Sequence, residues 1–327
     1  MKVMRWKTKR IGLLMLLSLL LAVGMLGCGG RETEKKRESA DGLVIVATLF
    51  PQYDFAREIV GDYGMVRLLL EPGMESHSFD PTTADMKEIN DADLFLYTGP
   101  ELETWVAQIE DSFSDRLHIV NLSENLMEEL EGAAHEEESH EEADHGEMGH
   151  HHEVEPHIWT NPVYAMEMVQ QICDAVCELD PEHADIYKEN TENYLAQLEN
   201  LDKAFQEVVE NGVRKEVVHG GRFALYYFAK RYGITFYAAY DSCEAQMEPS
   251  AKTVANLMKK VQEEQMTVVF YEELVEPRVA RSISEDTGAK LLLLHSCHNV
   301  SKEEFEAGAT YLGLMQKNVE NLRIALN

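Results

Sequence analysis

Strand-like and helix-like segments alternate along this chain, and the alternation occurs on both sides of one long helical stretch. In the first half, apolar runs at Leu43–Leu49, Val66–Leu70, Asp93–Tyr97 and His118–Leu122 are followed by helical patterns or turns. Strands joined by such crossovers pair in parallel, because each crossover returns the chain to the end of the sheet at which the previous strand began. We therefore predict an N-terminal α/β lobe over residues 43–180, with about four parallel strands.

The second half repeats this plan after residues 181–211, where apolar residues recur at helical spacing. A continuous helix of that length would span more than about 40 Å, enough to link two lobes. A C-terminal α/β lobe is expected over residues 212–327. Its strands are expected at Glu216–His219, Ile234–Tyr240, Thr267–Tyr271 and Ala289–His295, and its helices at Arg222–Tyr232, Ser250–Glu264, Glu276–Thr287 and Glu303–Leu326. The predicted fold class is α/β, with two lobes joined by a long rigid helix and a ligand cleft at the carboxyl ends of the strands.

The N-terminus has the pattern of an export signal. Residues 1–27 place basic residues before an apolar run of about 16 residues, shorter than the roughly 20 residues that a membrane span needs. Small residues followed by Cys28 resemble a bacterial lipoprotein cleavage box. We predict cleavage before Cys28, its lipidation on the outer face of the cell membrane, and a polar tether over residues 28–42. The alternative, an uncleaved anchor helix, puts the functional body on the same side of the membrane.

The charge balance excludes one class of partner. Without residues 1–27, the chain carries 59 acidic residues and a net charge near −35. Such a chain repels nucleic acid and attracts cations. We expect a monomer that binds no nucleic acid and whose ligand is cationic.

Residues 123–156 interrupt the alternation with a low-complexity acidic stretch. Its histidines are His135, His140, His145, His150, His151 and His152. Segments with many charges and few apolar residues cannot build a core, so we predict a disordered loop within the first lobe. A solvated spacer is one interpretation, but the histidines favour a loop that collects or senses metal weakly.

Four further histidines stand at strand ends or in loops, two in each lobe. They are His77 and His157 in the first lobe and His219 and His295 in the second. We expect them at the cleft, because ligands of open α/β sheets bind beyond the carboxyl ends of the strands. Neutral imidazole suits tetrahedral Zn²⁺, whereas Mn²⁺ prefers oxygen ligands. Glu272 and Glu273, at the end of another predicted strand, are candidates to orient a ligand histidine.

Three segments carry a resemblance to a known family. Gly73–Thr82, Asp91–Gly99 and Glu155–Pro162 resemble motifs of the zinc- and manganese-binding solute-binding proteins of ABC importers, and the similarity covers about residues 43–326. This resemblance implies one metal in the cleft, with ligands matching His77, His157 and His219. It also implies delivery of Zn²⁺ to a membrane permease and its ATPase subunit.

This chain departs from the family at the fourth ligand, where the family commonly has aspartate and this chain has His295. The alternatives are Cys297, His298, Glu244 and water. Cys243 and Cys297 are also candidates for a disulfide, which an exported protein can form, and two free thiols are the rival interpretation.

Three other functions fit the sequence less well. One is a manganese-binding protein of the same family, and another is an adhesin or a zinc store without a transporter. The third is a secreted zinc hydrolase, which needs a general base beside an open metal position. Glu75 and Glu244 are weak candidates for that base, and the chain has no HExxH pair. We therefore predict a binding protein rather than an enzyme.

Overall fold

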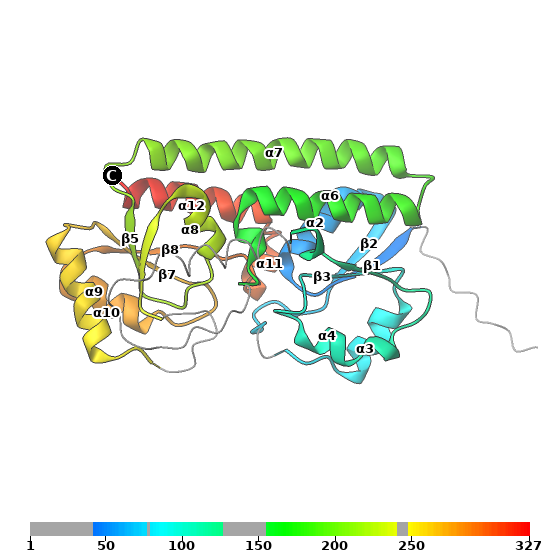
Figure 1. Ribbon diagram of the computed structural model, residues 1–327, viewed down its shortest axis with the longest axis horizontal. Coiled ribbons are helices and arrows are strands. Elements are labelled where there is room, and N and C mark those ends of the chain that lie inside the picture. Colours follow the sequence, from blue (N-terminus) through cyan, green and yellow to red (C-terminus); the bar gives the residue numbers. More distant parts are fainter. Residues whose placement is uncertain (1–41, 77–78, 127–154, 241–247) are drawn as a thin grey trace, which may run out of the picture. The chain divides into compact units, whose positions relative to one another are not determined.

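The computed structural model describes residues 42–76, 79–126, 155–240 and 248–327. The first sheet is parallel, with strand order β2-β1-β3-β4 (Figure 1). Its strands are β1 (Leu43–Ala47), β2 (Gly64–Leu68), β3 (Leu94–Tyr97) and β4 (His118–Asn121). Side chains on both faces of β1 and β3 are buried, as expected for the central strands of a parallel sheet that is covered on both sides.

The second sheet has the same plan, with strand order β6-β5-β7-β8 and parallel pairing throughout. Its strands are β5 (Glu216–His219), β6 (Thr235–Ala238), β7 (Val268–Tyr271) and β8 (Lys290–Leu293). In both sheets the strand order reverses beside the first strand of the lobe, at β1 and at β5. Ligands of open α/β sheets bind at such switch points. The predicted fold class, two parallel α/β lobes, is confirmed.

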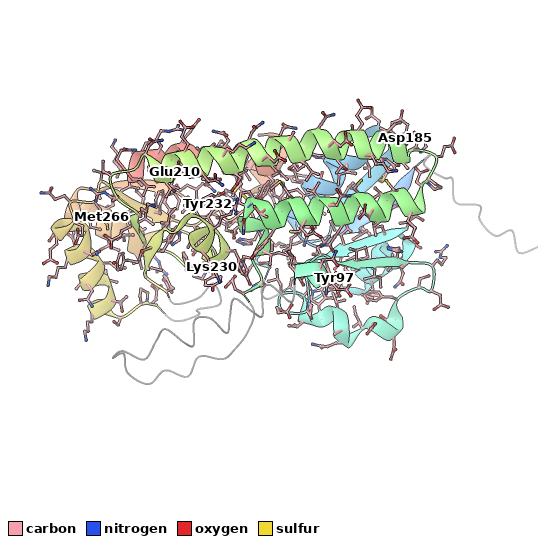
Figure 2. All side chains as sticks on the ribbon, turned by 45° about the horizontal axis from the view of Figure 1, so that its top comes forward. Tyr97, Asp185, Glu210, Lys230, Tyr232 and Met266 are labelled. Atoms are coloured by element: carbon pink, nitrogen blue, oxygen red, sulfur yellow. The ribbon has the colours of Figure 1, made fainter. Side chains whose placement is uncertain are left out.

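Helices cover both faces of the two sheets (Figure 1). The helices are α2 (Phe50–Val60), α3 (Thr83–Asp91), α4 (Thr104–Gln108), α6 (Pro162–Leu179), α7 (Ala184–Glu210), α8 (Tyr226–Tyr232), α9 (Ala251–Glu263), α10 (Arg278–Thr287), α11 (Lys302–Glu306) and α12 (Tyr311–Ala325). Helix α7 packs against α6 and α2 beside the first sheet and against α12 and α8 beside the second (Figure 1). Asp185 and Glu210 mark its two ends in Figure 2.

Two predicted helices differ from the structure. The helix expected over Glu303–Leu326 is two helices, α11 and α12, because Gly308 takes a φ of +75° and Thr310 then caps α12 by accepting the amide N–H of Gly313. The helix expected from Arg222 begins only at Tyr226. The backbone N–H of Arg222 donates instead to the Glu272 carboxylate at 3.2 Å.

One continuous core joins the two lobes. It contains Ile45 and Leu96 of the first sheet together with Val217 and Phe270 of the second. Polar contacts cross between the lobes as well: the Nδ2 group of Asn299 donates to the carbonyls of Glu71 at 2.9 Å and Met74 at 3.0 Å. None of the helices within the described residues is both long and apolar enough to cross a membrane.

Candidate metal-binding site

His219 is the last residue of β5, and its side chain is buried. A glycine must follow, because a Cβ at Gly220 would lie 2.5 Å from the Cα of Ala280. The chain turns here, and the amide N–H of Gly221 donates to Nδ1 of His219 at 3.3 Å. Among the described residues, nothing forms a hydrogen bond with the buried Nε2. Burial lowers the pKa of His219 to about 4, so the ring is neutral at physiological pH.

His157 reaches the same place from the first lobe. Its Nδ1 contacts the Glu155 carboxylate, which also accepts the backbone N–H of His157 at 3.2 Å. A carboxylate at Nδ1 fixes the orientation of an imidazole ring and favours the tautomer that leaves Nε2 able to bind a metal. Trp159 secures this segment to the second lobe by donating its Nε1–H to the carbonyl of Ser296 at 2.8 Å.

His298 lies across from His157, with ring centroids 6.4 Å apart and ring planes at 80°. Its Nδ1 is 2.7 Å from Oγ of Ser296 and 3.0 Å from Oε1 of Glu273. Burial raises the pKa of Glu273, but His295, His298 and the Ser296 hydroxyl outweigh burial and hold the pKa well below its usual range. Glu273 is therefore an ionised carboxylate that orients the ring of His298.

These three imidazoles line one small pocket. His157, His219 and His298 surround about 10 Å³ of space, which is near the volume that one water-sized particle requires. Their rings come from the two lobes. The Glu155 carboxylate contacts His157 and the Glu273 carboxylate contacts His298, while Glu75, Arg222 and Glu272 also line the pocket. A small cation that prefers nitrogen ligands suits this environment.

His295 is not among the residues that line this pocket. Its backbone N–H donates to Oδ1 of Asn318 at 2.8 Å, its Nδ1 accepts the amide N–H of Cys297 at 2.9 Å, and its Nε2 lies 4.0 Å from Oε2 of Glu304. Burial lowers its pKa, but the Glu273 and Glu304 carboxylates outweigh burial and raise the pKa overall. The sequence prediction grouped His295 with His157 and His219, whereas the structure surrounds it with carboxylates and Asn318.

Cys297 is fully buried in the core, and burial raises the pKa of its thiol well above the ordinary value. A buried thiol whose pKa is raised is a poor metal ligand, because zinc binds the thiolate. Cys297 forms no disulfide with any residue that the structure describes. Cys243 lies outside the described residues, so its disulfide with Cys297 stays a prediction.

Several predicted site residues also lie outside the described residues. They are Cys28, His77, His135, His140, His145, His150, His151, His152 and Glu244. Within residues 42–76, 79–126, 155–240 and 248–327, no group of three His, Cys, Asp or Glu side chains is close enough to hold a metal ion. The described residues thus bring together two of the four predicted ligands, His157 and His219, and add His298.

Comparison with known proteins identifies the family. A family model described as zinc-uptake complex component A, periplasmic (ZnuA) matches residues 45–325. The chain belongs to the ZnuA family. The family resemblance found in the sequence is thereby confirmed, and the family consists of transport proteins that bind a solute.

Individual ZnuA-family relatives agree with this assignment. The chain is 35% identical over 301 residues to the high-affinity zinc uptake system protein ZnuA of Bacillus subtilis, covering 91% of this chain and 92% of that protein. It is 32% identical over 316 residues to the zinc-binding lipoprotein AdcA of Streptococcus pneumoniae, covering 96% of this chain but only 60% of AdcA. The chain therefore spans somewhat more than half the length of the streptococcal relative.

Solved structures from the ZnuA family have the same fold. The metal-dependent lipoprotein YcdH of Bacillus subtilis superposes with a TM-score of 0.71 at 31% identity, over 87% of this chain and 99% of YcdH. The Zn(II)-bound ZnuA-like domain of pneumococcal AdcA gives 0.70 at 27% identity, over 87% and 99%. A laminin-binding protein of Streptococcus agalactiae, described as bifunctional with adhesin and metal transporting activity, gives 0.70 at 26%, over 88% and 100%.

Sequence reasoning missed one carboxylate that contacts a pocket histidine and left another as one of two candidates. Glu155 stands two residues before His157, a spacing that could have marked it as the partner of that ring. Glu273 was one of two neighbouring glutamates, and only the structure shows that Glu273 contacts His298 whereas Glu272 contacts Arg222.

Proposed function

We propose that this protein captures Zn²⁺ outside the cytoplasm and delivers it to the permease of an ABC importer, which an ATPase subunit drives. The observation that carries the proposal is the buried Nε2 of His219, which has no hydrogen-bond partner among the described residues and lies in a pocket with His157 and His298. Leaving a buried polar nitrogen without a partner is unfavourable, so the pocket favours a ligand that binds nitrogen. Zinc fits this chemistry and the names of the relatives.

The proposed ligands are His77, His157 and His219, with a fourth ligand from the segment that follows β8. Two histidines of that segment compete, His295 and His298. The geometry favours His298, because it lines the pocket, whereas His295 does not and its ring lies near the Glu273 and Glu304 carboxylates. Four neutral imidazoles leave the charge of Zn²⁺ uncompensated among its ligands, and the Glu155 and Glu273 carboxylates next to the rings offset part of it.

Competition titration with a zinc chelator tests the function and the fourth ligand together. The mature protein should bind one Zn²⁺ tightly, and His298→Ala should weaken binding by at least about 10-fold, since a ligand is replaced by water. His295→Ala should stay within about threefold of the parent. The reverse ranking would assign His295 as the ligand, and a parent that binds no Zn²⁺ tightly would refute the proposed function.

Two parts of the proposal concern segments that lie wholly or mostly outside the described residues. Lipidation of Cys28 would hold the protein at the outer face of the membrane, and mass spectrometry of the membrane-extracted protein would detect the added lipid. Residues 123–156 would hold additional Zn²⁺ weakly. Shortening that loop should remove the weak sites in a calorimetric titration and keep the tight one; loss of the tight site would place the transported ion in the loop.

A further inference from the structure

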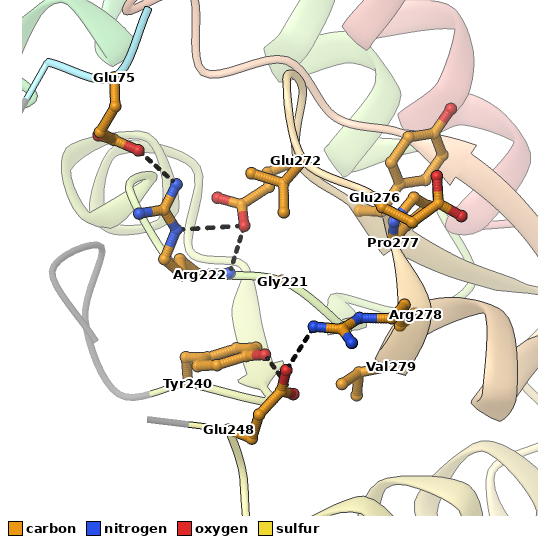
Figure 3. Close-up of a pocket in the computed structure, with 13 residues that line it drawn as sticks. Glu75, Gly221, Arg222, Tyr240, Glu248, Glu272, Glu276, Pro277, Arg278 and Val279 are labelled. Carbon is orange, nitrogen blue, oxygen red and sulfur yellow. Dashed lines mark hydrogen bonds and ion pairs between the residues drawn. The ribbon is translucent and has the colours of Figure 1, made fainter. Parts of the chain in front are cut away.

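A second and larger cavity adjoins the histidine pocket. It has a volume of about 350 Å³ and is lined mainly by residues of the second lobe (Figure 3). The two spaces share three lining residues, Glu75, Arg222 and Glu272, so this group forms the wall between them. A cation that passes from the larger cavity into the histidine pocket must pass this wall.

Arg222 connects the two carboxylates of the wall. Its Nε donates to Oε1 of Glu272 at 3.3 Å, and its Nη2 donates to Oε2 of Glu75 at 3.0 Å (Figure 3). The backbone N–H of Arg222 also donates to Oε1 of Glu272, at 3.2 Å. The guanidinium is therefore anchored by Glu272 within its own lobe and reaches across the cleft to Glu75 of the first lobe.

This ion triad is better shielded than an ordinary surface pair. The side chains of Arg222 and Glu272 are 20% and 15% exposed, and that of Glu75 is 37% exposed. Arginine suits the arrangement, because its planar group offers several donors in fixed directions and holds two carboxylates at once. The triad is shielded, and Arg222 is anchored to Glu272 through both its backbone and its side chain. It should therefore hold the edges of the two lobes together more firmly than an exposed ion pair would.

The position of Glu75 connects the triad to the metal ligands. Glu75 stands two residues before His77 in the chain, and two residues of extended chain span at most about 7 Å. Gly221 and Arg222 likewise follow directly after His219 and Gly220.

We propose that the Glu75–Arg222–Glu272 triad is a latch between the lobes that sets how fast Zn²⁺ enters and leaves the histidine pocket. The inference rests on the proposed function, since it concerns the same site. Arg222 acts as a positioning residue: it holds the edge of the first lobe against the second while the metal is bound, and the latch must open before the metal exchanges.

Stopped-flow measurement of both rates for Zn²⁺ tests the latch, with Arg222→Ala and Glu75→Gln compared with the parent. Release is followed with an excess of a fluorescent chelator, and association by mixing apoprotein with Zn²⁺. Opening the latch should accelerate both the association and the release of Zn²⁺. Each variant should therefore show both rates raised by about fivefold, with Kd within about twofold of the parent. Arg278→Ala is the matched control, because its ion pair with Glu248 lies away from the shared wall. It should leave both rates unchanged.

An effect of charge alone predicts a different result. Removing the positive charge of Arg222 would slow release and strengthen binding, and removing the negative charge of Glu75 would slow association and weaken binding. Either pattern, or unchanged rates in both variants, would overturn the latch. A parent that binds no Zn²⁺ tightly would instead overturn the proposed function, so the two failures are distinguishable. The Glu75 variant changes a partly exposed side chain and keeps the test available if Arg222→Ala does not fold.

Discussion

Asp54 is a buried carboxylate that connects two helices at a distance from the metal pocket. Its Oδ2 accepts the backbone N–H of Tyr311, at the start of α12, at 2.8 Å, and its Oδ1 accepts a hydrogen bond from Arg57 at 2.6 Å. Burial raises the pKa of Asp54 to about 6, although both hydrogen bonds oppose the rise. The folded protein therefore binds a proton at Asp54 more tightly than the unfolded chain does, whose value is near 3.9.

This difference predicts a pH-dependent stability. Because the folded pKa is raised, the stabilising effect of protonation is complete below about pH 4 and is lost as the pH rises through 6. Asp54→Asn cannot titrate, so its stability relative to the parent should improve by about 1 kcal/mol between pH 5 and pH 7. Urea unfolding of both apoproteins at the two pH values measures this. A stability difference that does not change with pH would contradict the raised pKa.

The contact between Glu155 and His157 gives a second prediction for single residues. Glu155→Gln removes the negative charge that orients the ring, so Zn²⁺ affinity should fall by about 10-fold. Glu178→Gln, an exposed change on α6 with the same change in net charge, controls for the general electrostatic field. Chelator competition compares the two. Equal affinities in both variants would show that Glu155 does not orient the ligand.

At the scale of elements, α7 is the helix that spans both lobes. Its 27 residues bury one face, which includes Tyr187 near one end and Phe205 near the other. Asp202 adds a polar connection to the second lobe: Arg231 donates Nε and Nη2 to its two carboxylate oxygens, each at 2.6 Å, and the hydroxyl of Tyr232 donates at 2.7 Å. Packing therefore fixes α7 along its length.

The stability of the protein should be sensitive to truncation of buried side chains in the middle of α7. Leu198 is fully buried there, and Leu198→Ala should lower the free energy of unfolding by about 3 kcal/mol, from the lost burial and the cavity that remains. Asn200→Ala, on the exposed face of the same turn, should stay within about 0.5 kcal/mol of the parent. Chemical denaturation of both variants checks this. Similar values for the two would mean that α7 contributes little to the core.

At the scale of the whole molecule, the two lobes share one large core, in addition to a smaller apolar cluster that each lobe has of its own. Apolar residues from both sheets lie in one cluster. The carbonyls of Glu71 and Met74 in the first lobe accept hydrogen bonds from Asn299, and the amide N–H of Gly73 donates to the carbonyl of Val300 at 2.7 Å. Contacts of this kind disfavour independent unfolding of either lobe.

We therefore expect one cooperative unfolding transition for residues 43–327 of the apoprotein. Scanning calorimetry should give equal calorimetric and van't Hoff enthalpies, because opening one lobe exposes the core of the other. Saturating Zn²⁺ should raise the Tm without splitting the transition, since a ligand that binds only the folded state stabilises it by mass action. Two resolved transitions in the apoprotein would show that the lobes unfold independently.

Part of the fold could be predicted from the sequence, because the signals that mark strands and helices are local. Alternating apolar runs and helical periods located most strands and helices, since strand and helix periods are properties of short segments. His219 was correctly placed at the end of its strand for the same reason. The split between α11 and α12 was missed, although Gly308 is the residue that permits it.

The choice between His295 and His298 depended on tertiary structure. Strand β8 ends at Leu293, and beyond it Cys297 takes a φ of +65°. In such an irregular segment the direction of successive side chains does not repeat at a fixed interval. The sequence therefore cannot show which side chain faces the cleft. The contacts of Arg222 with Glu75 and of Trp159 with Ser296 join residues more than 100 positions apart. The sequence by itself determined the two lobes and the histidines near their strand ends, while long-range packing alone decided which imidazoles meet and what holds the lobes around them.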